Sequence, residues 1–459
     1  MASKKELVEA QTFGRRRLLT AFVSGSPGGR EIEPQKPMRA VVAGVALSVL
    51  LVLGSLGYGL LKPGLPTGWD NNKLVLTKGS GARFVSIKGT LYPVLNTTSA
   101  RLVIPSESFE VVEVAESKIS DVPRGKQIGI TGAPDELPSP AHLVGSGWLA
   151  CVGDDGASRI QITQAPAGEA TTDSAVVTVA DQTYVVNGSY RYLVPKKDVT
   201  AVLRALQLES APVRAVTGPW LNVFTPGDDL APLFLPTAGD PLVTSTLPSG
   251  TVVGSVVEQT GSGTEARRYV VTAAGELAPL TEIGYQLYQL GSGAQLGAPI
   301  QVSSADIRDV RTAPELAPPT WPQAPAAAFD GLDPMCAVLQ VPPGSAPGAQ
   351  PVAHFALAAT TTTDALPTTG RAEVEVDAGK GALVRATGDQ LTDQGTVAII
   401  DQSGTVFAVP DPSTEVLAQL GYTAADISPV PQSWLAFLPA GPELTVAAAS
   451  MAPAGTSGS

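Results

Sequence analysis

The chain is poor in the side chains that most catalytic and metal sites use. Among its 459 residues it has only two cysteines, two histidines and 5% aromatic residues. Two histidines leave little material for a His-based catalytic triad, and two isolated cysteines without a C-x-x-C spacing do not resemble a zinc site. No H-E-x-x-H helix, strict G-x-S-x-G elbow or EF-hand loop occurs either. The sequence predicts no catalytic residue, no metal site and no cofactor.

Basic charge is also scarce. The chain has 30 basic and 42 acidic residues, a formal net charge of −12. Proteins that bind nucleic acids usually carry clustered Lys and Arg, so this composition argues against a DNA or RNA partner. The charge is uneven, because residues 1–61 carry +4 and the remainder carries −16.

A phosphate-binding loop is absent as well. P-loop ATPases need G-x-x-x-x-G-K-[ST], whose backbone amides and lysine hold the phosphates. Gly125-Lys126-Gln127 and Gly379-Lys380-Gly381 lack both the upstream glycine spacing and the Ser or Thr that binds magnesium. We therefore expect that the chain is not an enzyme.

Glycine and proline, in contrast, are abundant, at 47 and 40 residues. Gly weakens helix interiors, and Pro interrupts both helices and central strands. A chain of this length also exceeds one typical domain. The composition predicts several modules of a mixed α+β, β-rich fold with short strands and many turns.

The one long apolar run lies near the N-terminus. From Ala40 to Leu61 there are 22 residues without a charged side chain, and a helix of that length, about 33 Å, crosses a hydrocarbon core of about 30 Å. A buried core helix or a cleaved signal peptide is the alternative, but Leu60-Leu61-Lys62-Pro63 is no small-residue cleavage site. One such run predicts a single-pass membrane protein. Cations before the run outnumber those just after it, so the positive-inside rule places the N-terminus in the cytoplasm and Pro63 to Ser459 outside.

A second helix is predicted before this run. Between Lys5 and Val23, apolar residues recur at helical spacing beside Arg15-Arg16-Arg17. A basic amphipathic helix of this kind binds anionic lipid or a partner. A solvated arm whose charges only fix the topology is the alternative, and the sequence does not separate the two.

The two cysteines, Cys151 and Cys336, both fall in the predicted exported part. Disulfides persist in an oxidising compartment, so we expect one Cys151–Cys336 bridge. A reactive thiol or a metal site is the alternative. The bridge requires that the segments around both cysteines meet in one central body.

A β-hairpin pattern recurs four times in the exported part. Each copy is an apolar β-branched run, a Gly-containing turn, a second apolar run and usually a Pro, which favours hairpins over helices. The copies are 83–95, 184–195, 269–280 and 397–410. Repeats of roughly 45 to 50 residues bury little apolar surface on their own. We therefore expect them to pack on their neighbours in an elongated arrangement.

Further features accompany the hairpins. A four-residue motif follows each copy, at Ile119–Val122, Val213–Val216, Ile307–Val310 and Trp434–Phe437. Two copies also have a short helical stretch, Val199–Leu208 and Thr414–Leu420. Segments rich in Pro, Ala, Gly and Thr, notably Ala313–Ala328 and Pro342–Pro351, are predicted to be linkers.

These features predict nine segments along the chain. They are a cytoplasmic basic amphipathic N-terminus (1–38), a transmembrane helix (39–62), repeat 1 (63–138), the first part of a central core (139–180), repeat 2 (181–240), repeat 3 (241–320), the second part of the core (321–392), repeat 4 (393–450) and a disordered tail (451–459).

Several motifs together resemble EccB, the membrane component of actinobacterial type VII (ESX) secretion systems. The strongest are Gly81-Ala82-Arg83-Phe84-Val85, Leu91-Tyr92-Pro93-Val94-Leu95-Asn96, Gly129-Ile130-Thr131-Gly132-Ala133-Pro134-Asp135 and Leu438-Pro439-Ala440-Gly441-Pro442-Glu443-Leu444. Thr131 departs from the family, which usually has Pro there.

The resemblance implies a protein of the inner (plasma) membrane with a cytoplasmic helix, one transmembrane helix and four periplasmic repeats around a disulfide-bonded core. It also implies partners: the FtsK/SpoIIIE-like motor ATPase EccC, EccD, EccE and the mycosin protease, with six copies around an axis. Some family members have been labelled ATPases, but no nucleotide-binding motif can be carried onto residues of this chain. The leading hypothesis is a structural subunit of the secretion complex, and the alternatives are a membrane-anchored ATPase and a cell-wall-binding module.

Overall fold

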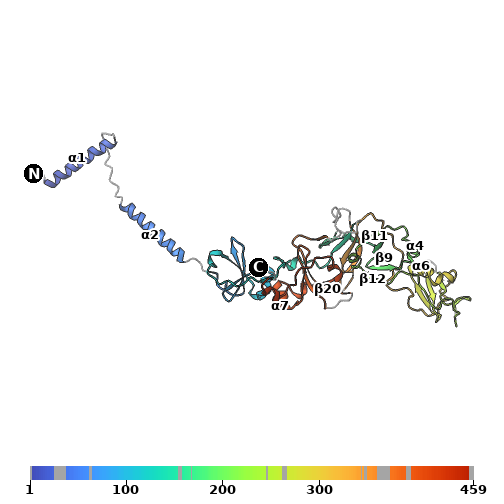
Figure 1. Cartoon of the computed structure of the whole chain (residues 1–459). Coiled ribbons are helices and arrows are strands. Elements are labelled where there is room, and N and C mark those ends of the chain that lie inside the picture. The colour runs from blue at the N-terminus through green and yellow to red at the C-terminus, as the bar shows by residue number, and fades with distance from the viewer. Residues whose placement is uncertain are drawn as a thin grey trace. The chain divides into compact units, whose positions relative to one another are not determined.

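The structure is a computed structural model that forms two compact units, Met1–Pro66 and Thr67–Ser459 (Figure 1). It describes residues 3–24, 38–60, 65–153, 158–166, 168–243, 247–260, 266–342, 344–345, 349–358, 373–388 and 394–453.

The first unit holds two helices, α1 (Lys4–Ser24) and α2 (Met38–Leu60). Among the described residues, α2 is the one helix long and apolar enough to cross a membrane. Its 23 residues correspond to about 35 Å at the rise of an α-helix. The predicted apolar helix is confirmed and contains Ala40, whereas Leu61 lies outside the described residues. Helix α1 confirms that 5–23 is helical, with its large apolar side chains exposed.

Four sheets of the second unit share one topology. In each, three consecutive antiparallel strands are followed by a helix, and a fourth strand then pairs parallel with the first. The repeat 1 elements are β1 (Lys73–Lys78), β2 (Arg83–Ile87), β3 (Thr90–Pro93), α3 (Thr97–Val103) and β4 (Val111–Ala115); those of repeat 2 are β8 (Ser174–Val179), β9 (Gln182–Asn187), β10 (Tyr190–Val194), α4 (Val199–Ala205), β11 (Val213–Ala215) and β12 (Thr225–Pro226). The repeat 3 elements are β13 (Val256–Gln259), β14 (Arg267–Val271), β15 (Leu277–Leu280), α6 (Glu282–Leu290) and β16 (Ile300–Val302); those of repeat 4 are β20 (Ala382–Thr387), β21 (Val397–Ile400), β22 (Val406–Val409), α7 (Thr414–Leu420) and β23 (Ser428–Pro431).

The four predicted hairpins are confirmed as the second and third strands of these sheets. In repeat 1 the hairpin turn is Lys88-Gly89, with φ of 47° and 75°. Positive φ at both residues of a two-residue turn matches the twist of the flanking strands. The hairpin pattern did not contain the first strand of each repeat. Sheet pairing places β8 and β20 with repeats 2 and 4, although they fall within the segments that the sequence analysis gave to the core.

A six-stranded sheet lies at the centre, in the order β19-β6-β5-β17-β18-β7. Its strands come from two distant parts of the chain. They are β5 (Leu149–Val152), β6 (Ser158–Ile162), β7 (Gly168–Ala170), β17 (Met335–Gln340), β18 (Val352–Ala358) and β19 (Glu373–Val376). Its inward side chains share one hydrophobic cluster with Val177 and Val186 of repeat 2 and with Val384 and Ile400 of repeat 4. The central sheet thus holds repeats 2 and 4 together.

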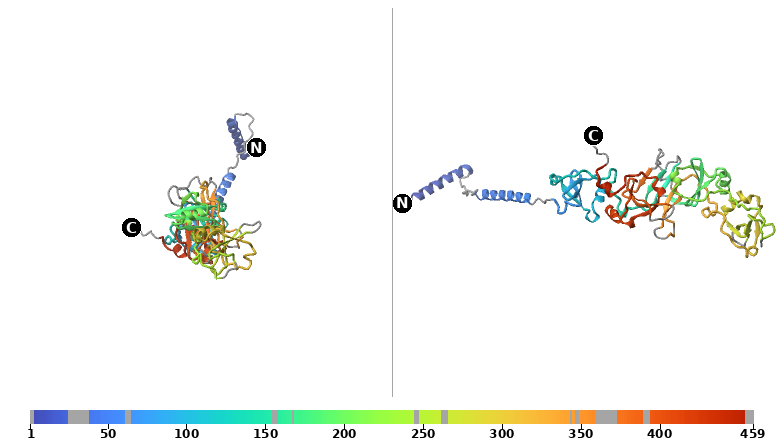
Figure 2. Two further views of the ribbon diagram at one scale, coloured as in Figure 1. Left: turned by 90° about the vertical axis from the view of Figure 1, so that its right-hand side faces the viewer. Right: turned by 60° about the horizontal axis from the view of Figure 1, so that its bottom comes forward.

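The repeats also pair through their helices. Helix α4 of repeat 2 contacts α6 of repeat 3, while α3 of repeat 1 contacts α7 of repeat 4 and the C-terminal α9 (Val446–Ser450). The sheets of repeats 1 and 3 lie at opposite ends of this unit (Figure 1; Figure 2, right). The predicted helices of repeats 2 and 4 are confirmed, and α3 and α6 are additional.

The four-residue motif is correct in three repeats and wrong in repeat 2. Val213–Ala215 is the strand β11, whereas the other three copies follow the fourth strand of their repeat. The structural equivalent is Trp220–Val223, which starts in the short helix α5 (Gly218–Leu221) as Trp434 lies in α8 (Gln432–Leu435). After this motif the chain pairs parallel with the third strand in every repeat, at Leu91↔Arg124, Tyr190↔Thr225, Leu277↔Thr312 and Val406↔Ala440.

The predicted linker Ala313–Ala328 is wrong as a free spacer. Ala317 and Trp321 are buried in the cluster that joins repeats 2 and 3, because Trp321 brings a large apolar ring into a segment that is mostly Ala and Pro. Of the tail 451–459, the structure describes only 451–453, where Gly129 N donates to Met451 O at 3.1 Å; 454–459 lie outside the described residues. Five 3-10 turns complete the described elements, at Ser106–Ser108, Glu116–Lys118, Pro140–His142, Ser292–Gln295 and Ala424–Asp426.

Candidate functional site

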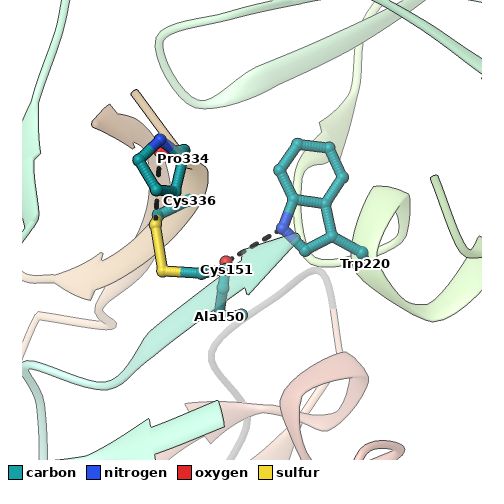
Figure 3. Close-up of a disulfide and its surroundings, with 5 residues drawn as sticks. All are labelled: Ala150, Cys151, Trp220, Pro334 and Cys336. Atoms are coloured by element: carbon teal, nitrogen blue, oxygen red, sulfur yellow. Dashed lines mark hydrogen bonds between the residues drawn. A yellow bond between two sulfur atoms is a disulfide. The ribbon is translucent and has the colours of Figure 1, made fainter. Parts of the chain in front are cut away.

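The predicted disulfide joins neighbouring strands of the central sheet (Figure 3). Cys151 on β5 stands directly opposite Cys336 on β17, with the Cα atoms 4.0 Å apart and the sulfurs 2.05 Å apart. Side chains alternate across a strand, so Leu149 and Cys151 face one side of the sheet while Ala150 and Val152 face the main cluster. Both sulfurs belong to a small apolar cluster, and no thiol remains for metal binding or catalysis.

The disulfide closes a loop with a sequence separation of 185 residues. This loop contains β6 and β7 of the central sheet and the whole of repeats 2 and 3, which follow β7 and end before β17. Closing a loop of this length stabilises the folded state by up to about 5 kcal/mol in the chain-entropy model. The bond therefore covalently fixes the base of the arm that contains these two repeats.

Trp220 docks repeat 2 onto the same strand. Its indole Nε1 donates to the carbonyl of Ala150 at 2.9 Å, and the side chain is fully buried (Figure 3). Thr217, the N-cap of α5, accepts from the Trp220 backbone N–H and orients this short helix. Phe224 packs edge-on against the indole, with the ring centroids 5.1 Å apart.

Trp434 is the equivalent residue in repeat 4. It packs edge-on against Trp148, with the ring centroids 6.3 Å apart, and Trp148 Nε1 donates to Val144 O. The Trp434 indole nitrogen is buried without an acceptor among the described residues. Repeats 1 and 3, which do not join the central cluster, have Ile119 and Ile307 at this position. Tryptophan thus marks the two repeats that dock on the central sheet.

Buried tyrosine hydroxyls tie distant segments to the repeats. Tyr192 donates to Thr320 O and Tyr422 donates to Pro138 O, both at 2.6 Å. Burial raises the pKa of both phenols above the usual range, so the hydroxyls remain protonated donors.

The two histidines each contact a serine in a different part of the unit. His142 Nδ1 lies 3.1 Å from Ser139 Oγ, and His354 Nδ1 lies 3.1 Å from Ser189 Oγ. Burial lowers the pKa of His354. Within the described ranges, no three His, Cys, Asp or Glu side chains gather in a way that could hold a metal ion.

Sequence reasoning found the cysteines and Ala40 but missed Trp220. The signal was present, because Trp220-Leu221-Asn222-Val223 has the same apolar spacing as Trp434-Leu435-Ala436-Phe437. The nearby Val213–Val216 competed with it and has the same pattern.

An apolar membrane helix followed by four like sheets around a disulfide-closed central sheet defines a class: inner membrane proteins with a repeat-built, strand-rich body. The model of the family described as "Type VII secretion system ESX-1, transport TM domain B" matches residues 1–457. The chain therefore belongs to this family, EccB, as its motifs indicated.

Relatives and solved structures agree with this membership. The chain is 36% identical over 165 residues to the "ESX-5 secretion system ATPase EccB5" of Mycobacterium marinum, a match covering 36% of this chain and 30% of the relative. It is 30% identical over 293 residues to the "ESX-2 secretion system ATPase EccB2" of Mycobacterium tuberculosis, covering 60% of this chain and 56% of the relative. These matches thus span well under two thirds of the relatives' length.

The fold matches two solved structures. One is a chain of the "intact ESX-5 inner membrane complex", with a TM-score of 0.64, 21% identity and coverage of 98% of this chain and 95% of that chain. The other is from the "EccB3 dimer from the ESX-3 core complex", with a TM-score of 0.66, 22% identity and coverage of 83% and 100%. The mixed α+β, strand-rich fold predicted from the sequence is thus confirmed.

Proposed function

We propose that the chain is a structural subunit of a type VII secretion membrane complex, which anchors the complex in the inner membrane and builds its periplasmic assembly for protein export. The observation that carries this proposal is the joining of four sheets to a covalently closed central sheet through buried tryptophans and paired helices. Such a body resists distortion and presents several repeat surfaces at once, as an assembly subunit requires. Similarity to chains of the ESX-5 and ESX-3 complexes supports it.

The proposed topology is a single pass with the N-terminus in the cytoplasm. The span runs from Ala40 to Leu61, and the cations before it stay inside. Ser3→Cys and Ser117→Cys, both at exposed positions, test this with a membrane-impermeant maleimide. We expect Ser117→Cys to react in intact spheroplasts and Ser3→Cys only after permeabilisation; the reverse pattern would contradict the orientation.

The proposed partners are an EccC-type ATPase, EccD, EccE and the mycosin protease, with this chain present in six copies. Crosslinking in its own envelope, detergent extraction and mass spectrometry of the native-gel band test this set. Recovery in a megadalton complex with a multi-span channel subunit and an FtsK-like ATPase is the expected result. A monomer with no such partners would remove the proposal.

We further propose that this chain does not hydrolyse ATP, although the relatives are named ATPases. The absence of a P-loop from the full sequence motivates this. Purified full-length chain is expected to release phosphate from ATP at the rate of a mock purification. Hydrolysis that copurifies with the chain through two successive columns would contradict it.

The proposed division into segments keeps the order N-terminus, span, repeat 1, core, repeat 2, repeat 3, core, repeat 4 and tail. The pairing of β8 with β9 and of β20 with β21 favours starting repeat 2 near Ser174 and repeat 4 near Ala382. Limited proteolysis with mass mapping tests these boundaries.

A further inference from the structure

A cavity of about 380 Å³ lies where repeat 2, the central sheet and repeat 4 meet. Repeat 2 contributes Arg191 and Thr225, the central sheet contributes Val352, and repeat 4 contributes Thr387. Its volume is in the range of small-molecule sites. Neither cysteine nor either docking tryptophan lines it, although Phe224, which packs on Trp220, does. The structural role described above does not require an open cavity at this point.

Among the described residues that line this cavity, Arg191 is the one with a charged side chain. It pairs across the hairpin with Val186, which is fully buried in the central cluster, so both side chains leave the same face of the repeat 2 sheet. The Arg191 Nε atom is shielded from solvent and has no hydrogen-bond partner among the residues that the structure describes. In the part of the chain that the structure describes, no carboxylate reaches its guanidinium.

A shielded Nε–H without an acceptor, on a half-buried arginine, favours an anion as its partner. Arg remains charged in proteins, and its planar fork donates two parallel hydrogen bonds to a carboxylate. A shielded donor left without a hydrogen bond costs free energy that such an anion recovers.

The rest of the lining selects among anions. Gln350 donates to Thr387 Oγ1 at 2.6 Å, which fixes a neutral polar wall, and Phe224 and Val352 add apolar surface. A single cation matches a monoanion, whereas a phosphate or polyphosphate brings more negative charge than one Arg neutralises. Amide and apolar walls suit peptide groups.

We propose that this cavity binds the carboxylate-bearing end of a peptide, with Arg191 holding the carboxylate. The site would give the chain a peptide-recognition function in addition to its structural role, and the inference does not rest on the proposed secretion complex. A segment of a neighbouring protein that ends in a free carboxylate fits this chemistry.

Calorimetric titration of the full-length chain in detergent tests this proposal. The probe is N-acetyl-Ala-Ala with a free carboxylate, compared with the same dipeptide as its C-terminal amide and with inorganic phosphate. We expect saturable binding of the acid. Binding should be weaker by about tenfold or more for the amide, which loses the fork-to-carboxylate pair, and for phosphate, which has no peptide group for the amide and apolar walls to contact.

Variants separate the site from a general effect on folding. Arg191→Gln is expected to weaken binding of the acid about tenfold or more, while Arg204→Gln, at an exposed position on α4 of the same repeat, leaves it unchanged. Arg191→Lys keeps the charge without the planar fork and is expected to fall between Arg191→Gln and the unmodified chain.

Four results would overturn the proposal. They are no saturable binding of the acid, equal binding of acid and amide, binding of the acid unchanged in both Arg191→Lys and Arg191→Gln, and phosphate binding as tight as that of the acid. The last would indicate a phosphate site.

Discussion

Single side chains decide how the repeats dock on the central sheet. Trp220 and Trp434 occupy equivalent positions, yet only Trp220 has an acceptor for its indole N–H among the described residues. A buried hydrogen bond contributes about 1 kcal/mol, and more when its loss leaves a buried partner unsatisfied. The two positions therefore form an internal comparison of ring packing with and without a hydrogen bond.

Trp220→Phe is expected to lower the free energy of unfolding by about 1 kcal/mol more than Trp434→Phe. Both changes remove similar ring volume, but only the first leaves the Ala150 carbonyl without its indole donor. Urea unfolding followed by circular dichroism measures the difference. Equal losses in the two variants would show that the Nε1–Ala150 contact contributes nothing.

His354 makes the stability of the second unit depend on pH. Burial lowers its pKa in the folded chain below the ordinary value of 6.5. As the pH falls below 6.5, the unfolded chain takes up a proton that the folded chain binds only at lower pH, so stability is lost. Above pH 6.5 His354 is neutral in both the folded and the unfolded chain, so none of this stability is lost.

Between pH 7.5 and pH 5, the melting temperature of His354→Gln is expected to fall less than that of the unmodified chain. This range of pH spans the ordinary histidine pKa of about 6.5. Thermal unfolding at both pH values measures this. His142→Gln, at an exposed position, is the matched control and should follow the unmodified chain. A His354→Gln curve parallel to the unmodified chain would contradict the mechanism.

At the scale of elements, the repeat helices act as connectors between neighbouring repeats. Helix α6 is capped by Thr281, whose side chain accepts from Gly284 N, and it buries Ile283 and Leu287 against Val202 and Leu206 of repeat 2. The sequence indicated α4 and α7 as short helical stretches shared by two of the repeats. It did not indicate which helix each would meet, because helix pairing depends on faces brought together from distant segments.

Leu287→Ala is expected to destabilise the α4–α6 contact by about 2–5 kcal/mol, since Leu287 is fully buried. Hydrogen exchange should rise throughout 256–302 while the central sheet stays protected. Leu290→Ala, at a more exposed position of the same helix, is the control, with an effect within about 0.5 kcal/mol. Exchange that rises equally in both variants would rule out a connector role for Leu287.

At the scale of the whole molecule, the disulfide divides the chain into an arm and a base. Repeats 2 and 3 form the closed arm, and repeats 1 and 4 join it through the central sheet and the α3–α7 contact. In this unit the helix of repeat 1 contacts that of repeat 4, and the helix of repeat 2 contacts that of repeat 3. Repeats that are neighbours in the sequence are therefore not all neighbours in space (Figure 1).

The double change Cys151→Ser and Cys336→Ser is expected to lower the free energy of unfolding by up to about 5 kcal/mol, because the unfolded chain regains the entropy of the open loop. Dithiothreitol should lower the urea midpoint of the unmodified chain to that of the variant and leave the variant unchanged. If dithiothreitol leaves the urea midpoint of the unmodified chain unchanged, this account is contradicted.

The sequence alone determined the features that depend on local pattern or on the number of cysteines. An uncharged run from Ala40 onward predicts an apolar helix, two cysteines allow one intramolecular bridge, and Gly-centred β-branched runs such as Arg83–Leu95 fold as hairpins. The tertiary structure decided what depends on distant surfaces. Strands β8 and β20 belong to repeats 2 and 4 because they pair with β9 and β21. Trp321 is buried in a segment that the sequence predicted to be a linker. Arg191 lines a cavity because the sheets of repeat 2 and repeat 4 meet the central sheet there. Strand pairing and burial between distant segments cannot be predicted from a short stretch of sequence. Only the folded chain therefore shows these features.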